Sequence, residues 1–351
     1  MVEQANICWY RIQKCGYYKG PRAATPAFGN LPEVLEDILR WCPGKQLAQT
    51  LTFNPNDDDS EDEQLPVYLL DFRGAGDNWL LKLWNETPAI EGKVASIPQT
   101  AVVGGGGVVM NELAPDTIPG IATYFYFVPS MNAVAAIRFK HRVLGHASMR
   151  RYISGFVRQK GRHICWSNQP DESGNFEMLG YAANALQAPV NYFPQFRSEI
   201  MKLPGRREEL VRSARDVKRA VRRIELKSGR RPDRSFWQKL MENTGLSAPR
   251  VAPDTVRVQY ELSTTMDPTS MDNLIAEWEE ARGDHDGWED IGFVFRGEQT
   301  PQWISRSIAR GTIPLDVEWE NEEVVSTQSL LNQLISHRDA ITALCRATNS
   351  T

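Results

Sequence analysis

Two groups of side chains have the residue types that metal-dependent nucleases use. Such sites combine carboxylates, which hold a divalent ion, with a lysine that stabilises negative charge in the transition state. Asp77 with Glu91–Lys93 has this composition, and so does Asp216 with Glu225–Lys227. The second group falls on an expected helix rather than a strand, and short patterns of this kind recur by chance. We expect no catalytic residues, and a nuclease remains the alternative.

Metal-binding residue types also occur close together. His141, His146, His163 and Cys165 lie within one short segment, but their spacing matches no common zinc pattern. The glycine run 104–107 is not followed by Lys-Ser or Lys-Thr, so it is not a phosphate-binding P-loop. We therefore expect no metal site and no cofactor.

Cations are the most distinctive group. The window Ile137–Arg162 contains no acidic residue. On an expected strand over Ala133–Arg142 the basic residues Arg138, Lys140 and Arg142 are two positions apart, which places them on one face, where they could follow a phosphate backbone. A solvated face balanced by acids elsewhere is the alternative. The candidate DNA-binding residues of this window are Arg138, Lys140, Arg142, Arg150, Arg151, Arg158, Lys160 and Arg162.

A second set of cations follows in 206–227, which we predict to be one long helix. Apolar residues from Leu210 to Ile224 are spaced four, three, four and three, and basic residues form a stripe beside them. The apolar seam could pack within the fold or pair with a second copy. The candidate DNA-binding residues here are Arg206, Arg207, Arg212, Arg215, Lys218, Arg219, Arg222 and Arg223.

Charge along the whole chain is segregated in the same way. Residues 137–234 hold 22 Lys and Arg against 9 Asp and Glu, although the formal net charge of the chain is −4. Both flanking segments are acidic. Local field rather than total charge attracts phosphates, so this pattern indicates a polyanion-binding surface.

The expected fold is α+β, with a mainly antiparallel sheet in an N-terminal domain (1–165) and a C-terminal α+β region (166–351) that holds the long basic helix and dimerisation elements. Apolar runs separated by turn residues predict hairpins over 67–84 and 121–142. Further strands are expected over 7–12, 256–262 and 291–295, and helices over 31–41, 147–159, 270–281 and 326–346.

Composition places the chain among globular proteins of the cytoplasm. Its 351 residues are 41% hydrophobic, and no window has the run of about 20 apolar residues that spans a bilayer. The five cysteines are spread widely without a C-x-x-C pair, which favours reduced thiols.

Several short stretches resemble the RexA-like phage-exclusion (abortive infection) family of DNA-binding proteins. They are Asp290–Phe293, Arg310–Leu315, Ala340–Leu344 and the pair Tyr124–Val128 with Ala136–Phe139. The resemblance implies a homodimer that binds double-stranded DNA with little sequence preference. It also implies a sensor role with a separate effector, which would be a membrane protein encoded nearby.

These observations predict a non-enzymatic, sequence-nonspecific DNA-binding sensor of a bacterial or prophage anti-phage system. Two alternatives remain: a metal-dependent nuclease effector, and a protein-interaction module with a basic docking surface.

Overall fold

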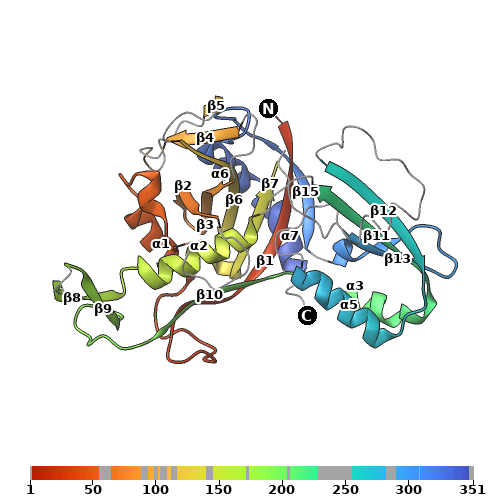
Figure 1. Ribbon diagram of the computed structural model, residues 1–351, viewed down its shortest axis with the longest axis horizontal. Helices are drawn as coiled ribbons and strands as arrows, with labels where there is room; N and C mark the ends of the chain where they lie inside the picture. Colours follow the sequence, from red (N-terminus) through yellow and green to blue (C-terminus); the bar gives the residue numbers. More distant parts are fainter. Residues whose placement is uncertain are drawn as a thin grey trace. The chain divides into compact units, whose positions relative to one another are not determined.

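The computed structural model describes residues 2–54, 65–87, 94–98, 102, 109–111, 117–139, 145–170, 174–203, 206–227, 255–281, 290–307 and 309–347. The chain forms two compact units (Figure 1). Unit 1 comprises residues 1–203 and 308–351, and unit 2 comprises 204–307. The division therefore differs from the predicted boundary after residue 165, which falls inside a strand of unit 1.

Unit 1 is built on a nine-stranded antiparallel sheet with the central order β10-β1-β7-β6-β3-β2. Its long first strand pairs with β7, β10 and β15, so it links strands from distant parts of the chain. The strands are β1 (Val2–Tyr18), β2 (Val67–Ala75), β3 (Asn78–Glu86), β4 (Val94–Pro98), β5 (Val109–Asn111), β6 (Thr117–Val128), β7 (Ala133–Arg138), β10 (Phe193–Ile200) and β15 (Arg310–Asp316).

Helices cover both faces of this sheet. Side chains alternate along a strand, so β1 sends Ile7 and Trp9 to one core and Cys8 and Tyr10 to the other. The first core includes helices α6 (Thr327–Ser336) and α7 (Arg338–Ala347). The second includes α1 (Leu31–Trp41) and α2 (His146–Gln159). A separate ribbon, β8 (Ile164–Pro170) with β9 (Phe176–Tyr181), follows α2.

Local signals explain the elements that were predicted. The side chain of Asn30 accepts a hydrogen bond from the Glu33 amide at 3.2 Å and caps α1, and Pro32 stands in its first turn. Between β6 and β7 the turn places Asn132 at φ 46°, a left-handed conformation that Asn tolerates. Helix α1 and both hairpins are therefore confirmed, as is the α+β class, except that the second hairpin's strand β7 ends at Arg138 rather than Arg142.

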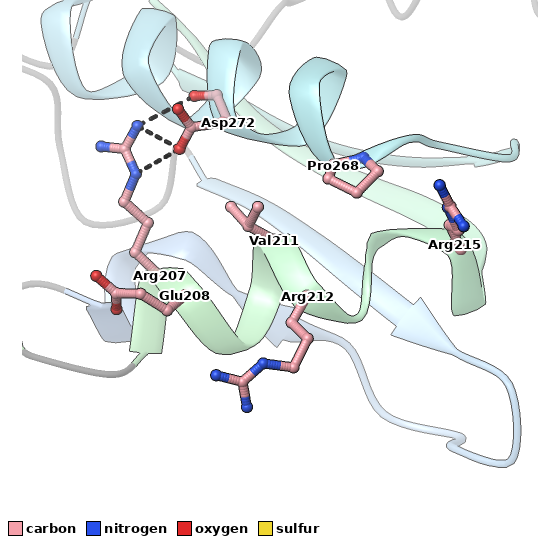
Figure 2. Close-up of a pocket in the computed structure, with 7 residues that line it drawn as sticks. All are labelled: Arg207, Glu208, Val211, Arg212, Arg215, Pro268 and Asp272. Carbon is pink, nitrogen blue, oxygen red and sulfur yellow. Dashed lines mark hydrogen bonds and ion pairs between the residues drawn. The ribbon is translucent and has the colours of Figure 1, made fainter.

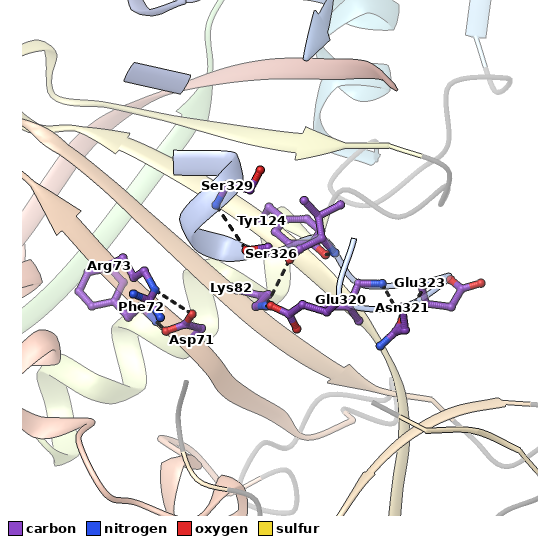
Figure 3. A network of polar contacts seen from close by, with 12 residues as sticks. Asp71, Phe72, Arg73, Lys82, Tyr124, Glu320, Asn321, Glu323, Ser326 and Ser329 are labelled. Atoms are coloured by element: carbon purple, nitrogen blue, oxygen red, sulfur yellow. Dashed lines mark hydrogen bonds and ion pairs between the residues drawn. The ribbon is translucent and has the colours of Figure 1, made fainter. Parts of the chain in front are cut away.

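Polar contacts attach the segment before α6 to the sheet (Figure 3). Lys82 of β3 is 2% exposed; its ammonium contacts Glu320 Oε1 at 2.8 Å and the Val325 carbonyl at 3.3 Å. The Val325 amide donates to the Tyr124 hydroxyl at 2.7 Å. A buried ammonium needs such partners, because losing one would leave an unpaired charge in the interior.

Unit 2 contains a four-stranded antiparallel sheet in the order β12-β11-β13-β14. Its elements are α3 (Arg206–Arg212), the short 3-10 turn η3 (Ala214–Asp216), β11 (Val217–Lys227), β12 (Thr255–Ser263), α5 (Pro268–Ala281), β13 (Asp290–Phe295), β14 (Gln302–Trp303) and η4 (Ile304–Ser307). Helices α3 and α5 pack on one face of the sheet around Leu210, Met271 and Phe293.

The prediction of one long basic helix over 206–227 is wrong. The helix ends at Arg212, and the chain continues as strand β11, which pairs with β12 and β13. The spacing of the apolar residues suggested a helix because the first three of them, Leu210, Ala214 and Val217, do pack in one core. Val221 packs on the opposite side, with Val294 and Trp303. Pairing with strands far along the chain overrides the helical period.

Candidate nucleic-acid interface

Unit 2 carries a group of exposed cations within one short segment of the chain. Between Arg206 and Arg223 there are eight Lys and Arg against three acids. Five of the eight are exposed, and within the described part of the chain they make no ion pair. We call them the open cation set: Arg206, Arg212, Arg215, Lys218 and Arg222.

The other three cations of this segment are committed to contacts within the unit. Arg207 Nε donates to Asp272 Oδ1 at 2.7 Å and so joins α3 to α5. Arg219 donates to Glu261 at 2.7 Å across the β11–β12 pair. Arg223 stacks on Trp303 with 3.8 Å between the guanidinium carbon and the ring centre. These three side chains therefore stabilise unit 2.

A groove of about 520 Å³ runs beside the open cation set, between α3 and α5. Figure 2 shows Arg207 hydrogen-bonded to Asp272, with Arg212 and Arg215 separate from that pair. Val211 and Pro268 form the apolar part of the lining. The groove thus combines the guanidinium groups of Arg212 and Arg215, which make no ion pair among the described residues, with a small apolar surface and the carboxylate of Glu208.

Helix α2 of unit 1 carries a second group of cations. Arg150 and Arg158 are eight residues apart, so they share one side of the helix, and Lys160 follows at its end. All three are exposed and have no ion pair among the described residues. Arg151 instead packs over Phe53 at 5.4 Å from its ring centre. Arg162 pairs with Glu33 at 3.4 Å.

Of the predicted row of cations on the strand over 133–142, the structure describes only Arg138. β7 ends at Arg138, which is half-buried at the start of that row. Lys140 and Arg142 lie outside the described residues, as does His141. The structure therefore distributes the predicted site over α2 in unit 1 and over α3, η3 and β11 in unit 2.

The carboxylate and lysine groups are only partly described. Asp77 lies in the β2–β3 turn and accepts hydrogen bonds from Ser130 and Arg338. Burial opposes ionisation, but the Ser130 hydrogen bonds and the Arg338 charge outweigh it and lower the pKa of Asp77. Glu91 and Lys93 lie outside the described residues, as do the side chains of Glu225 and Lys227. Asp77 itself links the β2–β3 turn to Ser130 and Arg338.

The two described histidines of the candidate metal-binding group, His146 and His163, are buried. His146 stacks on Tyr10 with 3.6 Å between ring centres, and its Nε2 is 2.9 Å from Ser198 Oγ. Nδ1 of His163 is 3.0 Å from the Ala182 carbonyl oxygen. The described residues bring no three His, Cys, Asp or Glu side chains together as a metal site. Nor do they include a helix that combines the length and the apolar character needed to cross a bilayer.

Comparison with known proteins gives no relative: no family model, no curated protein and no solved structure matches this chain.

Proposed function

We propose that the chain binds double-stranded DNA through its phosphate backbone, without reading sequence. The observation that carries this proposal is the open cation set. Five exposed Lys and Arg without ion pairs in the described structure occur within 17 residues, while the neighbouring cations Arg207 and Arg219 are neutralised. Cations that stabilise a fold acquire acidic partners, and cations kept free are available to an external anion.

The distribution of these cations favours backbone contacts over base readout. They lie on a helix of seven residues, a 3-10 turn and the first half of a strand. A recognition helix inserts one face into the major groove and reads bases with several side chains from that face. Phosphate contacts instead require only charge and reach, which cations on three successive short elements supply.

The resemblance to the RexA-like family adds a biological role to this proposal. DNA binding would be the sensing step of an anti-phage system, and a separate effector would carry out the response. The DNA-binding step can be tested on the purified chain alone.

The test is fluorescence anisotropy of the full chain with a random-sequence duplex, single-stranded DNA and RNA, each with and without Mg²⁺. We expect the duplex to bind whatever its sequence, and to stay intact in Mg²⁺. Absence of binding to every nucleic acid at low salt would refute the proposal, and cleavage of the duplex in Mg²⁺ would favour the nuclease alternative.

A pair of variants locates the surface. The first replaces the open cation set with Ala. The control replaces five other exposed cations, Lys19, Arg22, Arg40, Arg197 and Arg346, so that both variants lose the same charge. We expect the first variant to lose most of its affinity for the duplex and the control to retain it. Equal loss in both would show that total charge, rather than this surface, governs binding.

A further inference from the structure

The two strands that flank unit 2 lie in line with each other beside β1. β10 pairs with one half of β1 and β15 pairs with the other half, and both run antiparallel to it. Ile200 ends β10 opposite Tyr10. Arg310 begins β15 opposite Cys8, so only Trp9 separates the two paired stretches of β1. β10 and β15 together therefore occupy the place of one strand that is interrupted opposite Trp9.

The backbone of Trp9 bonds to both ends of this interruption. The Met201 amide donates to the Trp9 carbonyl at 2.9 Å, and the Trp9 amide donates to the Ala309 carbonyl at 3.0 Å. In an uninterrupted antiparallel pair, one residue makes both of these hydrogen bonds. The Ala309 amide in turn donates to the Met201 carbonyl at 2.8 Å. The chain thus leaves the sheet and returns to it at a single position of the strand pairing.

The point of interruption is part of the core of unit 1. Met201 is 3% exposed and Ala309 is 0% exposed, and both pack in the same cluster as Trp9. The Trp9 indole donates to the Ile341 carbonyl of α7 at 3.0 Å. All described members of this cluster belong to unit 1. The core that surrounds the interruption is therefore built without side chains of unit 2.

Unit 2 has a core of its own. Leu210 of α3, Ile275 of α5 and Phe293 of β13 are buried in one cluster. The described members of this cluster, and of the smaller one on the other side of the sheet, all belong to unit 2. The ion pair of Arg207 with Asp272 also lies within the unit. A separate hydrophobic core is what allows a segment of a chain to fold alone.

We propose that unit 2 is a module inserted into one strand of unit 1, that each unit folds without the other, and that unit 2 alone carries duplex binding. Removal of residues 202–309 would join Met201 to Arg310 and preserve the strand register on both sides of Trp9. From the first core of unit 1 this removes only Ala309 and the half-buried Leu203. The duplex part of the inference rests on the proposed function, and the insertion itself does not.

Scanning calorimetry of the full chain tests the insertion without DNA. We expect two unfolding transitions. Phe293→Ala in the core of unit 2 should lower one of them by about 10 °C or more and leave the other in place. The matched variant Phe125→Ala, in a core of unit 1, should do the reverse. One transition that both variants lower would overturn the inference, because the two units would then unfold as one.

The chain without residues 202–309 gives a second measurement. We expect it to unfold cooperatively, at the temperature of the transition that Phe125→Ala lowers in the full chain. A one-residue slip would turn every side chain of β15 to the wrong face, so the variant that also loses Arg310 should melt at a lower temperature. Failure of the first deletion variant to fold would show that unit 1 needs unit 2.

A random-sequence duplex then tests where binding resides. In calorimetry of the full chain, saturating duplex should raise only the transition that Phe293→Ala lowers, because a ligand stabilises the unit that binds it. The chain without residues 202–309 retains the cations of α2, and its affinity for the duplex should be at least about 100-fold weaker than wild type. Retained affinity would overturn the assignment of binding to unit 2. Absence of binding by the full chain would instead refute the proposed function, and the calorimetric test of the insertion would stand.

Discussion

The burial of His146 at the start of α2 predicts an acid-sensitive fold. Its side chain is 5% exposed, stacks on Tyr10 and reaches Ser198 with Nε2. Burial, followed by the nearby charge of Arg150, lowers the pKa of His146 from 6.5 to about 3. The native state therefore holds the neutral imidazole over a pH range in which the unfolded chain binds a proton.

The sign and size of the effect follow from this difference in pKa. Above pH 6.5 the imidazole is neutral in both states and contributes no pH dependence. Below pH 6.5 only the unfolded state gains the proton, so stability falls until the pH reaches about 3. Two pH units below 6.5, at pH 4.5, the loss is about 2.7 kcal/mol, at about 1.36 kcal/mol for each unit.

Urea unfolding at pH 7 and pH 4.5 measures this loss against a suitable reference. The double variant His146→Phe with Ser198→Ala keeps a ring against Tyr10 and leaves no unpaired hydroxyl. Both proteins share all other titrating groups, so we expect the wild type to lose about 2.7 kcal/mol more than the variant between the two pH values. Equal losses would show that His146 is protonated in the native state, and would refute its burial.

Three further predictions follow. Gly155→Ala should destabilise unit 1 by about 1–3 kcal/mol in thermal or urea unfolding, although Ala usually favours a helix, because a Cβ there would lie 2.4 Å from the Thr52 carbonyl oxygen. Asp77→Asn should lower the free energy of unfolding by about 1 kcal/mol at pH 7, because the ion pair with Arg338 is lost. The fold lowers the pKa of Asp77, so this difference in stability from wild type should shrink as the pH falls below about 4. Arg212→Ala should weaken binding to duplexes of different sequence by the same factor in anisotropy and reduce the salt slope by about 0.9.

Elements defined by neighbouring residues could be predicted from the sequence. Helix α1 was located at both ends because Pro32 starts it and Pro43-Gly44 follows it. The β2–β3 hairpin was located because Gly76 and Asp77 separate two apolar runs, and Gly76 adopts a φ of 60°.

Features that depend on distant residues could not be predicted. Strand β11 forms because β12 and β13, far along the chain, pair with it. The spacing of the apolar residues within the segment favours a helix instead. The boundaries of unit 2 arise because β10 and β15 both return to β1. No signal within either segment reveals these partners.

Contacts between distant residues also limited how much of the candidate site could be predicted. The sequence located the cations but could not separate available side chains from committed ones, because Arg207 finds Asp272 65 residues away and Arg219 finds Glu261 42 residues away. The exposed apolar side chains of the β8–β9 ribbon were also missed, since only pairing between β8 and β9 brings Trp166 beside Met178.

The salt dependence of duplex binding tests the central claim most directly. If each residue of the open cation set neutralises one phosphate, the slope of log K against log salt for the wild type should exceed that of the five-Ala variant by about 4.5, from about 0.9 for each contact. Between 50 and 200 mM salt this corresponds to about a 500-fold larger loss of affinity in the wild type. Equal slopes for the two proteins would contradict the account, because binding would then not depend on these cations.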